Sequence, residues 1–219
     1  MLKVINPTRL LSDPFCWSLV SYLDTHKEIA LRDIREVFTD GAPLDHSLER
    51  LIKAGYIERK DRRYSAVFTR LTSLESLELD QEVFVETDSP IYHQLQQLTY
   101  PVETANVTNG VIICEDVDFM RENLTLDTYF YRRQNMLEVA EFEQELYWIL
   151  GDVNKEYALK YMTTFLLKFI RKEVVMQKRS DIFVTAMCLL GFIEKIDESS
   201  YRLGMTVDRV SLRFISHKR

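Results

Sequence analysis

A five-residue phrase occurs twice in this chain of 219 residues, at positions 136 residues apart. The first copy is Gly-Tyr-Ile-Glu-Arg at residues 55–59, and the second is Gly-Phe-Ile-Glu-Lys at residues 191–195. An amphipathic stretch precedes each copy, and a polar turn and a tyrosine follow it. Glycine ends a helix at little conformational cost, and apolar residues that alternate with polar ones are typical of strands. The repeat therefore predicts a helix that leads directly into a hairpin at both ends of the chain.

The residues before the first copy predict three helices. Asp13 can cap the first helix, and Pro14 suits its first position because proline has no N–H to leave unpaired. A second, shorter helix is predicted over residues 30–38. Leucines at helical spacing predict a third helix over residues 44–54. Three helices followed by a hairpin over residues 56–67 are typical of a winged helix-turn-helix unit.

The C-terminal third repeats this order of elements. Asn154 can cap a long helix that continues to about residue 172, and Ser180 can cap a shorter helix that ends before Gly191. A hairpin is predicted over residues 192–203. Residues 209–214 alternate between polar and apolar, which predicts an edge strand with a basic outer face.

The segment between these two units gives weaker signals. Short strands and helices, one of them capped by Thr125, are separated by turns, one of them at Tyr100-Pro101. We therefore expect a helix-rich α+β protein with two winged-helix-like units that flank a small mixed α/β region. The expected boundaries are residues 1–67 for the N-terminal unit, 68–136 for the connecting region and 137–219 for the C-terminal unit with its basic tail.

Composition places this chain among ordered globular proteins. Apolar residues make up 46% of the sequence, and there are only six glycines and five prolines. No apolar run is long enough to span a bilayer, and the N-terminus has no pattern of a signal peptide. The three cysteines, Cys16, Cys114 and Cys188, are scattered in apolar stretches, which favours buried reduced thiols over a disulfide framework. We expect a cytoplasmic protein that does not contact a membrane.

The net charge of −6 is unevenly distributed. Residues 1–65 are nearly neutral at +1, residues 66–153 carry −13, and residues 154–219 carry +6. The overall acidity argues against a protein that simply coats nucleic acid. The basic C-terminal third either packs against the acidic segment or meets an anionic partner.

Seven basic side chains of the N-terminal unit are candidates for contact with nucleic acid. Three lie on one face of the predicted helix over residues 44–54, and four surround the tip of the hairpin. They are His46, Arg50, Lys53, Arg59, Lys60, Arg62 and Arg63. Arginine on such a helix can read a guanine edge, and cations on a hairpin can neutralise phosphates. Asp45 and Glu49 share the helix face, however, so a merely solvated surface is the alternative.

A second group of basic residues follows one face of the long C-terminal helix. It consists of Lys160, Lys168, Arg171 and Lys172. This ridge either tracks phosphates or a partner protein, or it is the solvated side of a core helix. The second hairpin has an acidic tip at residues 197–200, and the helix before it is apolar almost all round. That helix is therefore expected to be buried, and its unit to serve packing or dimerisation.

The sequence has none of the common signatures of catalytic sites, such as the nucleophile elbow, the phosphate-binding loop or the zinc-protease motif. Glu115, Asp116 and Asp118 follow a predicted strand, where carboxylates can hold Mg²⁺, but no phosphate-binding sequence accompanies them. We therefore expect no enzyme activity, no metal and no cofactor. A metal-dependent enzyme built on these carboxylates is the weaker alternative.

Three runs of the sequence resemble a family of uncharacterised cytoplasmic proteins from streptococci and related Gram-positive bacteria, catalogued as a domain of unknown function. The runs are residues 4–10, 80–85 and 149–162, and the likeness extends over nearly the whole chain. The resemblance implies a bacterial, cytoplasmic protein. It carries no catalytic or binding residue over to this chain.

Together these features predict a regulator-like protein that binds nucleic acid, with double-stranded DNA as the expected ligand and the C-terminal unit as a dimerising element. Two-fold symmetry would then require a palindromic site whose half-sites lie about one helical turn apart. The alternative is an adaptor whose winged-helix units bind other proteins and no nucleic acid. The overall acidity favours the adaptor, and the basic hairpin favours the regulator.

Overall fold

The computed structural model describes residues 1–39 and 43–217 and has α+β architecture, as the sequence predicts. The chain divides into two units, Met1–Gln97 and Leu98–Arg219, each with its own hydrophobic core. The division falls inside the segment 68–136 that is expected from the sequence to connect the two ends. The elements of that segment are therefore shared between the units.

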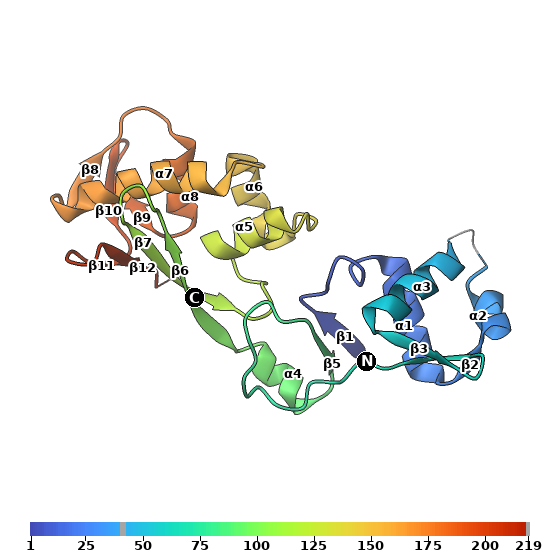
Figure 1. Cartoon of the computed structure of the whole chain (residues 1–219). Coiled ribbons are helices and arrows are strands. Elements are labelled where there is room, and N and C mark those ends of the chain that lie inside the picture. The colour runs from blue at the N-terminus through green and yellow to red at the C-terminus, as the bar shows by residue number, and fades with distance from the viewer. Residues whose placement is uncertain (40–42, 218–219) are drawn as a thin grey trace. The chain divides into compact units, whose positions relative to one another are not determined.

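The described residues of the first unit form three helices, a short fourth helix and five strands (Figure 1). In chain order they are β1 (Leu2–Ile5), α1 (Pro14–His26), β2 (Ile29–Ala30), α2 (Leu31–Val37), α3 (Leu44–Ala54), β3 (Ile57–Lys60), β4 (Arg63–Ala66), β5 (Val83–Glu86) and α4 (Pro90–Leu95). The sheets are antiparallel, with orders β2-β4-β3 and β1-β5. Helix α1 packs against β4, and α3 packs against β3.

The helix boundaries in the first unit follow from the predicted caps. The Asp13 carboxylate accepts hydrogen bonds from the N–H groups of Phe15 and Cys16, at 2.8 and 3.3 Å, so α1 begins where predicted. Gly55 ends α3 at a φ of +82°, in the left-handed region that suits glycine. Its N–H donates to the Ile52 carbonyl at 3.0 Å, which satisfies one of the last carbonyls of the helix.

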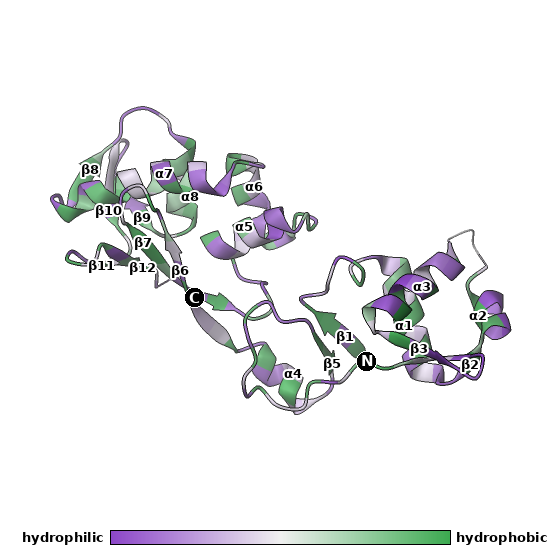
Figure 2. Ribbon diagram, in the orientation of Figure 1, coloured by the Kyte–Doolittle hydropathy of each residue, from purple (hydrophilic) through white to green (hydrophobic). Residues whose placement is uncertain are grey.

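Aromatic side chains attach β5 to the core of the first unit. Phe84 of β5 is buried and stacks on Phe68 with ring centroids 4.1 Å apart. Trp17 of α1 also stacks on Phe84, with ring centroids 6.4 Å apart. The β1–β5 ladder pairs Val4 with Phe84, so this ladder holds the N-terminus of the chain to the same core. Figure 2 shows β1 as hydrophobic and the β3–β4 hairpin as largely hydrophilic.

The second unit combines two sheets with several helices around one core. Its elements are β6 (Thr99–Ala105), β7 (Ile112–Asp118), α5 (Leu126–Gln134), the 3-10 helix η1 (Glu141–Glu143), α6 (Gln144–Leu150), α7 (Lys155–Leu166), the 3-10 helix η2 (Leu167–Ile170), β8 (Val174–Met176), α8 (Ile182–Leu189), β9 (Ile193–Lys195), β10 (Ser200–Leu203), β11 (Thr206–Asp208) and β12 (Arg213–Ile215). The sheet orders are β8-β10-β9 and β11-β12-β7-β6. Phe192 and Phe214 are among the fully buried side chains of the core.

The sequence repeat corresponds to a repeated structure. Gly191, at a φ of +76°, donates to the Cys188 carbonyl at 3.1 Å, as Gly55 donates to Ile52. The residue after each glycine donates to the carbonyl five positions before it, from Tyr56 to Leu51 and from Phe192 to Met187. The sheet orders β2-β4-β3 and β8-β10-β9 also match. The two copies of this motif differ in one element. The first copy has α2 between β2 and α3, whereas the second has no helix among the described residues between β8 and α8.

Two local predictions for the helices of the second unit need correction. Helix α8 is capped by Asp181, whose carboxylate accepts from the N–H groups of Phe183 and Val184, and not by Ser180. Serine and aspartate are equally good capping residues, so the sequence alone does not separate these neighbours. The α-helical part of the long helix ends at Leu166 and continues as a 3-10 turn.

Two strands also differ from expectation. Tyr100-Pro101 lies within β6 and not in a turn, because β6 is an edge strand and proline is tolerated where no ladder partner needs its N–H. Residues 209–212 form a turn, and only Arg213 and Phe214 of the predicted strand lie in β12. Strand β12 lies between β11 and β7, so it is not at an edge. Lys218 and Arg219 of the basic tail lie outside the described residues.

All three cysteines are free; Cys16 is fully buried, and Cys114 and Cys188 are half-buried. Burial raises the pKa of each thiol, with the Asp13 carboxylate adding to the effect at Cys16. In the part of the chain that the structure describes, no helix has the length and apolar character needed to cross a bilayer.

Candidate nucleic-acid interface

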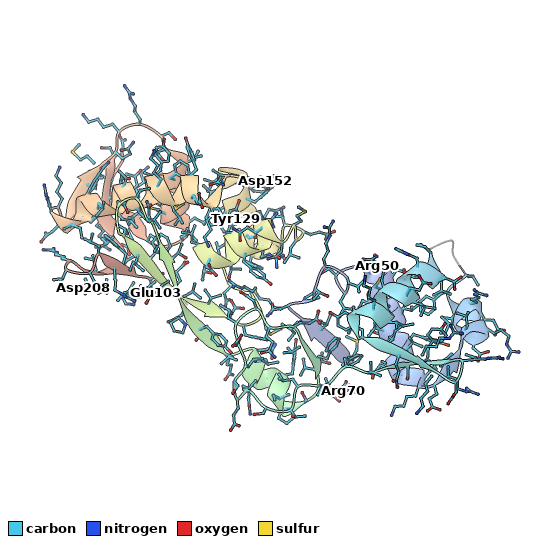
Figure 3. The ribbon with its side chains drawn as sticks, in the orientation of Figure 1. Arg50, Arg70, Glu103, Tyr129, Asp152 and Asp208 are labelled. Carbon is cyan, nitrogen blue, oxygen red and sulfur yellow. The ribbon has the colours of Figure 1, made fainter. Side chains whose placement is uncertain are left out.

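The three basic residues predicted for α3 lie together on its exposed face. Leu44, Ser47, Leu48 and Leu51 form the buried face of the helix. His46, Arg50 and Lys53 are exposed, and their spacing of four and three residues places them one above another. The side chain of Arg50 is labelled on α3 in Figure 3. The helix therefore presents a basic stripe to solvent, as expected.

The carboxylates on α3 are not equivalent. Asp45 is bound by the Arg35 guanidinium of α2, with Nη2 at 3.0 and 3.1 Å from the two carboxylate oxygens. An ion pair between these exposed groups offsets the negative charge of Asp45. Glu49 is exposed and has no ion pair among the described residues. Glu49 therefore opposes the positive charge of this face much more than Asp45 does.

The β3–β4 hairpin displays the other four predicted cations. The register pairs Arg59 with Tyr64 and Lys60 with Arg63, and Asp61 and Arg62 form the two-residue tip. All four cations are exposed. The Arg59 guanidinium lies 5.6 Å from the centroid of the Tyr64 ring, a cation–π distance. This contact fixes the direction of Arg59 without neutralising its charge.

Arg63 also has a structural role in the hairpin. Its Nη1 donates to the Glu28 carbonyl at 2.8 Å, which ties the hairpin to the segment before β2. Arg62 has φ +64° and Asp61 has φ +50°, so both tip residues are left-handed. Two consecutive left-handed residues form the turn that suits the twist of a two-residue hairpin, although glycine and asparagine are the usual occupants.

A polar cluster that the sequence did not reveal anchors the start of this hairpin. The Tyr56 hydroxyl donates to Glu82 Oε1 at 2.7 Å and lies 2.9 Å from Thr8 Oγ1. Glu82 Oε2 also accepts from the N–H of Thr8 at 2.6 Å. Burial, followed by the contact with Glu82, raises the pKa of Tyr56 to about 12, so its hydroxyl keeps its proton at neutral pH.

The second group of predicted cations lies on the exposed side of α7 and η2 and in the two residues after η2. Lys160, Lys168, Arg171 and Lys172 are all exposed. Lys160 Nζ lies 5.8 Å from the ring centroid of Tyr161, and Lys168 Nζ lies 4.6 Å from that of Phe165. Two exposed tyrosines that the sequence did not single out, Tyr157 and Tyr161, share this side of the helix. These two tyrosines could have been identified from the sequence, because they lie at helical spacing from the lysines of the same face.

Helix α8, the counterpart of α3, has a different surface. Phe183, Val184, Ala186 and Met187 are buried, as its apolar sequence predicts. Ile182 is nevertheless 49% exposed, so the helix is not buried on all sides. The hairpin after it has an acidic tip, where Asp197 accepts from the N–H groups of Ser199 and Ser200 at 2.8 Å. The α8–hairpin surface therefore differs in charge from the basic surface of the first unit.

Two of the three carboxylates considered for a metal site, Glu115 and Asp118, have structural roles, whereas Asp116 is exposed. Glu115 is 5% exposed and accepts from the N–H groups of Leu126 and Asp127 at the start of α5, at 2.9 and 3.1 Å. Asp118 accepts from the N–H groups of Glu122 and Asn123. Over residues 1–39 and 43–217, no group of three or more His, Cys, Asp or Glu side chains is placed to hold a metal ion.

Burial dominates the titration of Glu115. Removal from water raises the pKa of its carboxyl to about 7, and the nearby Asp127 carboxylate adds to the increase. The two backbone hydrogen bonds and the Lys155 ammonium act in the opposite direction. Asp127 itself is bound by the Arg121 guanidinium at 2.6 Å and by Lys155 at 3.5 Å. These contacts hold an acidic segment against α5.

Comparisons with known proteins give one match. No curated protein and no solved structure matched the chain. Residues 2–98, which coincide with the first structural unit almost to the residue, match the model of a domain of unknown function, DUF1803. The runs 4–10 and 80–85 that carry the family resemblance fall inside the matched residues, whereas the run 149–162 falls outside them. The match therefore covers the first unit and leaves the second without an assigned relative.

Proposed function

We propose that this chain is a cytoplasmic bacterial regulator that binds double-stranded DNA through its first unit and dimerises through its second. The first unit is then a winged-helix-like module. Helix α3 enters the major groove with His46, Arg50 and Lys53, and the β3–β4 hairpin holds phosphates with Arg59, Lys60, Arg62 and Arg63. The order of elements from α1 to β4 and the sheet order β2-β4-β3 support this assignment.

The free charge of the seven candidate side chains carries the proposal. Among the described residues, none of them forms an ion pair with a carboxylate, whereas other arginines of the same unit do. Arg35 binds Asp45, and Arg70 binds Asp24 and Glu86 at 2.6 and 3.1 Å. No carboxylate of the described residues therefore offsets the charges of Arg50 and Lys53 on α3 or of the four hairpin cations by an ion pair, which leaves them available to an anionic partner.

The dimensions of the helix suit this role. The major groove of B-DNA is about 12 Å wide and admits an α-helix. Helix α3 has 11 residues, about three turns, and its exposed face carries side chains that reach base edges or phosphates. Arg50 stands between His46 and Lys53 on that face, and arginine is the side chain best suited to a guanine edge.

A salt titration tests the proposal. Binding of the full chain to mixed-sequence duplex DNA is expected to weaken steeply as salt rises, because each neutralised phosphate releases counterions. The double substitution Arg62→Ala/Arg63→Ala should lower the slope of log K against log salt by about 1.8, at about 0.9 for each phosphate that is no longer neutralised. Lys178→Ala/Arg179→Ala removes two exposed cations from the second unit and serves as the matched control, with an unchanged slope.

The adaptor alternative makes a different prediction. A protein that binds other proteins through these units would show no duplex binding, or binding that responds little to salt. The net charge of −6 favours this alternative, since it opposes approach to a polyanion at long range. Absent or salt-insensitive duplex binding by the wild-type chain would leave the adaptor, and equal salt slopes for the wild-type chain and the Arg62→Ala/Arg63→Ala variant would overturn the assignment of the hairpin to phosphates.

A further inference from the structure

Aromatic and basic side chains alternate along the exposed side of α7. Lys160, Tyr161 and Thr164 lie three, four and seven residues after Tyr157, the spacing of one helix face. Lys168 continues this series in η2, and Arg171 and Lys172 follow at its end. We call Tyr157, Lys160, Tyr161, Lys168, Arg171 and Lys172 the α7 stripe. All six side chains are exposed, while the opposite face of α7 is buried in the core.

The charges of the α7 stripe are not used within the unit. No carboxylate of the described residues lies within ion-pair distance of Lys160, Lys168, Arg171 or Lys172. Elsewhere in this unit arginines are paired; Arg202 binds Glu194 at 2.7 Å, and two arginines of α5 bind the buried Glu143. The four positive charges of the stripe are therefore complementary to a chain of phosphates.

The two tyrosines of the stripe offer flat apolar surface beside these charges. Tyr157 is 51% exposed and Tyr161 is 41% exposed. Tyr161 lies parallel to Phe183 of α8, with an angle of 6° between the rings and centroids 5.2 Å apart. The ring centroid of Tyr157 lies 4.7 Å from that of Tyr161 and 5.9 Å from that of Phe183. The buried phenylalanine thus holds the tyrosines in place, and their outer surfaces remain open to solvent.

We propose that the α7 stripe binds single-stranded nucleic acid, with its cations on the phosphates and Tyr157 and Tyr161 stacked against unpaired bases. Bases in a duplex are stacked on each other and do not offer their faces, so the tyrosines distinguish single strands from the duplex ligand of the first unit. From Tyr157 to the end of η2 the track is about 22 Å long, at about 1.5 Å per α-helical and 2 Å per 3-10 residue. That length accommodates several nucleotides.

A basic hollow at the end of the stripe supports this assignment. Lys172 borders an open hollow of about 380 Å³ together with Arg202, Arg209 and one carboxylate, Glu173. Phe169 and Val207 supply part of its apolar wall. Arg202 is paired with Glu194, but Lys172 and Arg209 have no ion pair among the described residues. The positive surface therefore continues past η2 and extends the path of the strand.

The experiment compares a fluorescent oligothymidylate of about 20 nucleotides with an abasic strand of the same length, both titrated with the full chain over a range of salt. Lys168→Ala/Lys172→Ala should lower the salt slope for both strands by about 1.4, at about 0.7 for each phosphate contact in single strands. Tyr157→Ala should weaken binding of the base-bearing strand roughly 5- to 150-fold and leave the abasic strand unchanged. Tyr157→Phe keeps the ring and should bind like the wild-type chain.

Two controls separate this site from the rest of the molecule. Trp148→Ala removes a side chain that is 75% exposed on α6, outside the stripe, and should not change binding. Arg62→Ala/Arg63→Ala tests the first unit and should leave single-strand affinity within about twofold, so the two proposals fail independently. The inference is overturned if the single strand does not bind, if Tyr157→Ala weakens both strands equally, or if the hairpin variant loses as much affinity as Lys168→Ala/Lys172→Ala.

Discussion

Replacing Arg62 by glycine should stabilise the first unit and weaken DNA binding at the same time. Arg62 occupies the tip of the β3–β4 hairpin at φ +64°, next to Asp61 at φ +50°. A left-handed conformation costs a residue with a Cβ atom about 1–2 kcal/mol, and glycine avoids this cost. Glycine loses about 0.5–1 kcal/mol more backbone entropy on folding, which offsets part of the gain. A net stabilisation of about 0.5–1 kcal/mol remains.

Thermal unfolding followed by circular dichroism gives the first readout. For a unit that spans Met1–Gln97, this stabilisation should raise its melting temperature by about 3–6 °C. The same variant removes one cation from the hairpin tip, so the salt slope for duplex DNA should fall by about 0.9. Strain held at a binding site is expected where the side chain serves a ligand rather than the fold.

Asp61→Gly is the matched control, because it relieves the neighbouring left-handed residue while removing a negative charge. It should stabilise the unit less than Arg62→Gly, because aspartate tolerates the left-handed conformation better than arginine, and it should strengthen DNA binding. A lower melting temperature for Arg62→Gly would refute the strain argument. An unchanged salt slope together with a higher melting temperature would show that the hairpin tip does not contact phosphates.

Three further substitutions test the second unit. Because burial raises the pKa of Glu115 to about 7, the folded state holds its proton more tightly, and stability should fall as pH rises from about 4.5 to 7; Glu115→Gln should flatten that dependence in urea unfolding. Gly204→Ala would place a Cβ 2.5 Å from the Gly191 carbonyl oxygen, so the midpoint of unfolding should drop by an amount equivalent to about 1–3 kcal/mol. Glu143→Ala removes the buried carboxylate that pairs with two partly buried arginine guanidinium groups and should destabilise by about 3–5 kcal/mol in the same assay, whereas a decrease below about 1 kcal/mol would contradict this estimate.

Local signals in the sequence predicted most of the helix starts well. Asp13, Thr125 and Asn154 cap α1, α5 and α7, and each accepts a hydrogen bond from the first turn of its helix. These predictions succeed because a cap depends on residues within a few positions of each other. The β3–β4 hairpin was also predictable, since its register follows from the two-residue tip between its strands.

The sheet of β11, β12, β7 and β6 was not predictable in the same way. Phe214 pairs with Ile113 in a parallel ladder that joins strands far apart in the sequence. The local sequence does not identify the partner of a parallel strand, because the two strands are joined by a long connection and any apolar strand of similar length could pair. Pro101 added to the difficulty, since it signals a turn unless the strand is known to lie at an edge.

The candidate site was predictable in part. Exposure of the charged residues on α3 followed from helical periodicity, and exposure of the hairpin cations followed from their position at a tip. The ion pair that offsets Asp45 could not be inferred, because its partner Arg35 belongs to another helix. The stacking of Tyr161 on Phe183 likewise joins two helices that are separate in the sequence. Pairs of this kind require the tertiary arrangement.

The two copies of the helix and hairpin have similar backbones but different surface residues. At an offset of 136 residues, Arg50 corresponds to Ala186 and Lys53 to Leu189. Arg50 and Lys53 are exposed, whereas Ala186 is fully buried and Leu189 is partly buried. The glycine and the buried hairpin isoleucine occur in both copies, where they serve the backbone turn and the core, while the outward-facing residues of the first copy are different residues in the second. The positive charges that we propose for a ligand of the second unit therefore lie on the α7 stripe and not on the counterpart of α3.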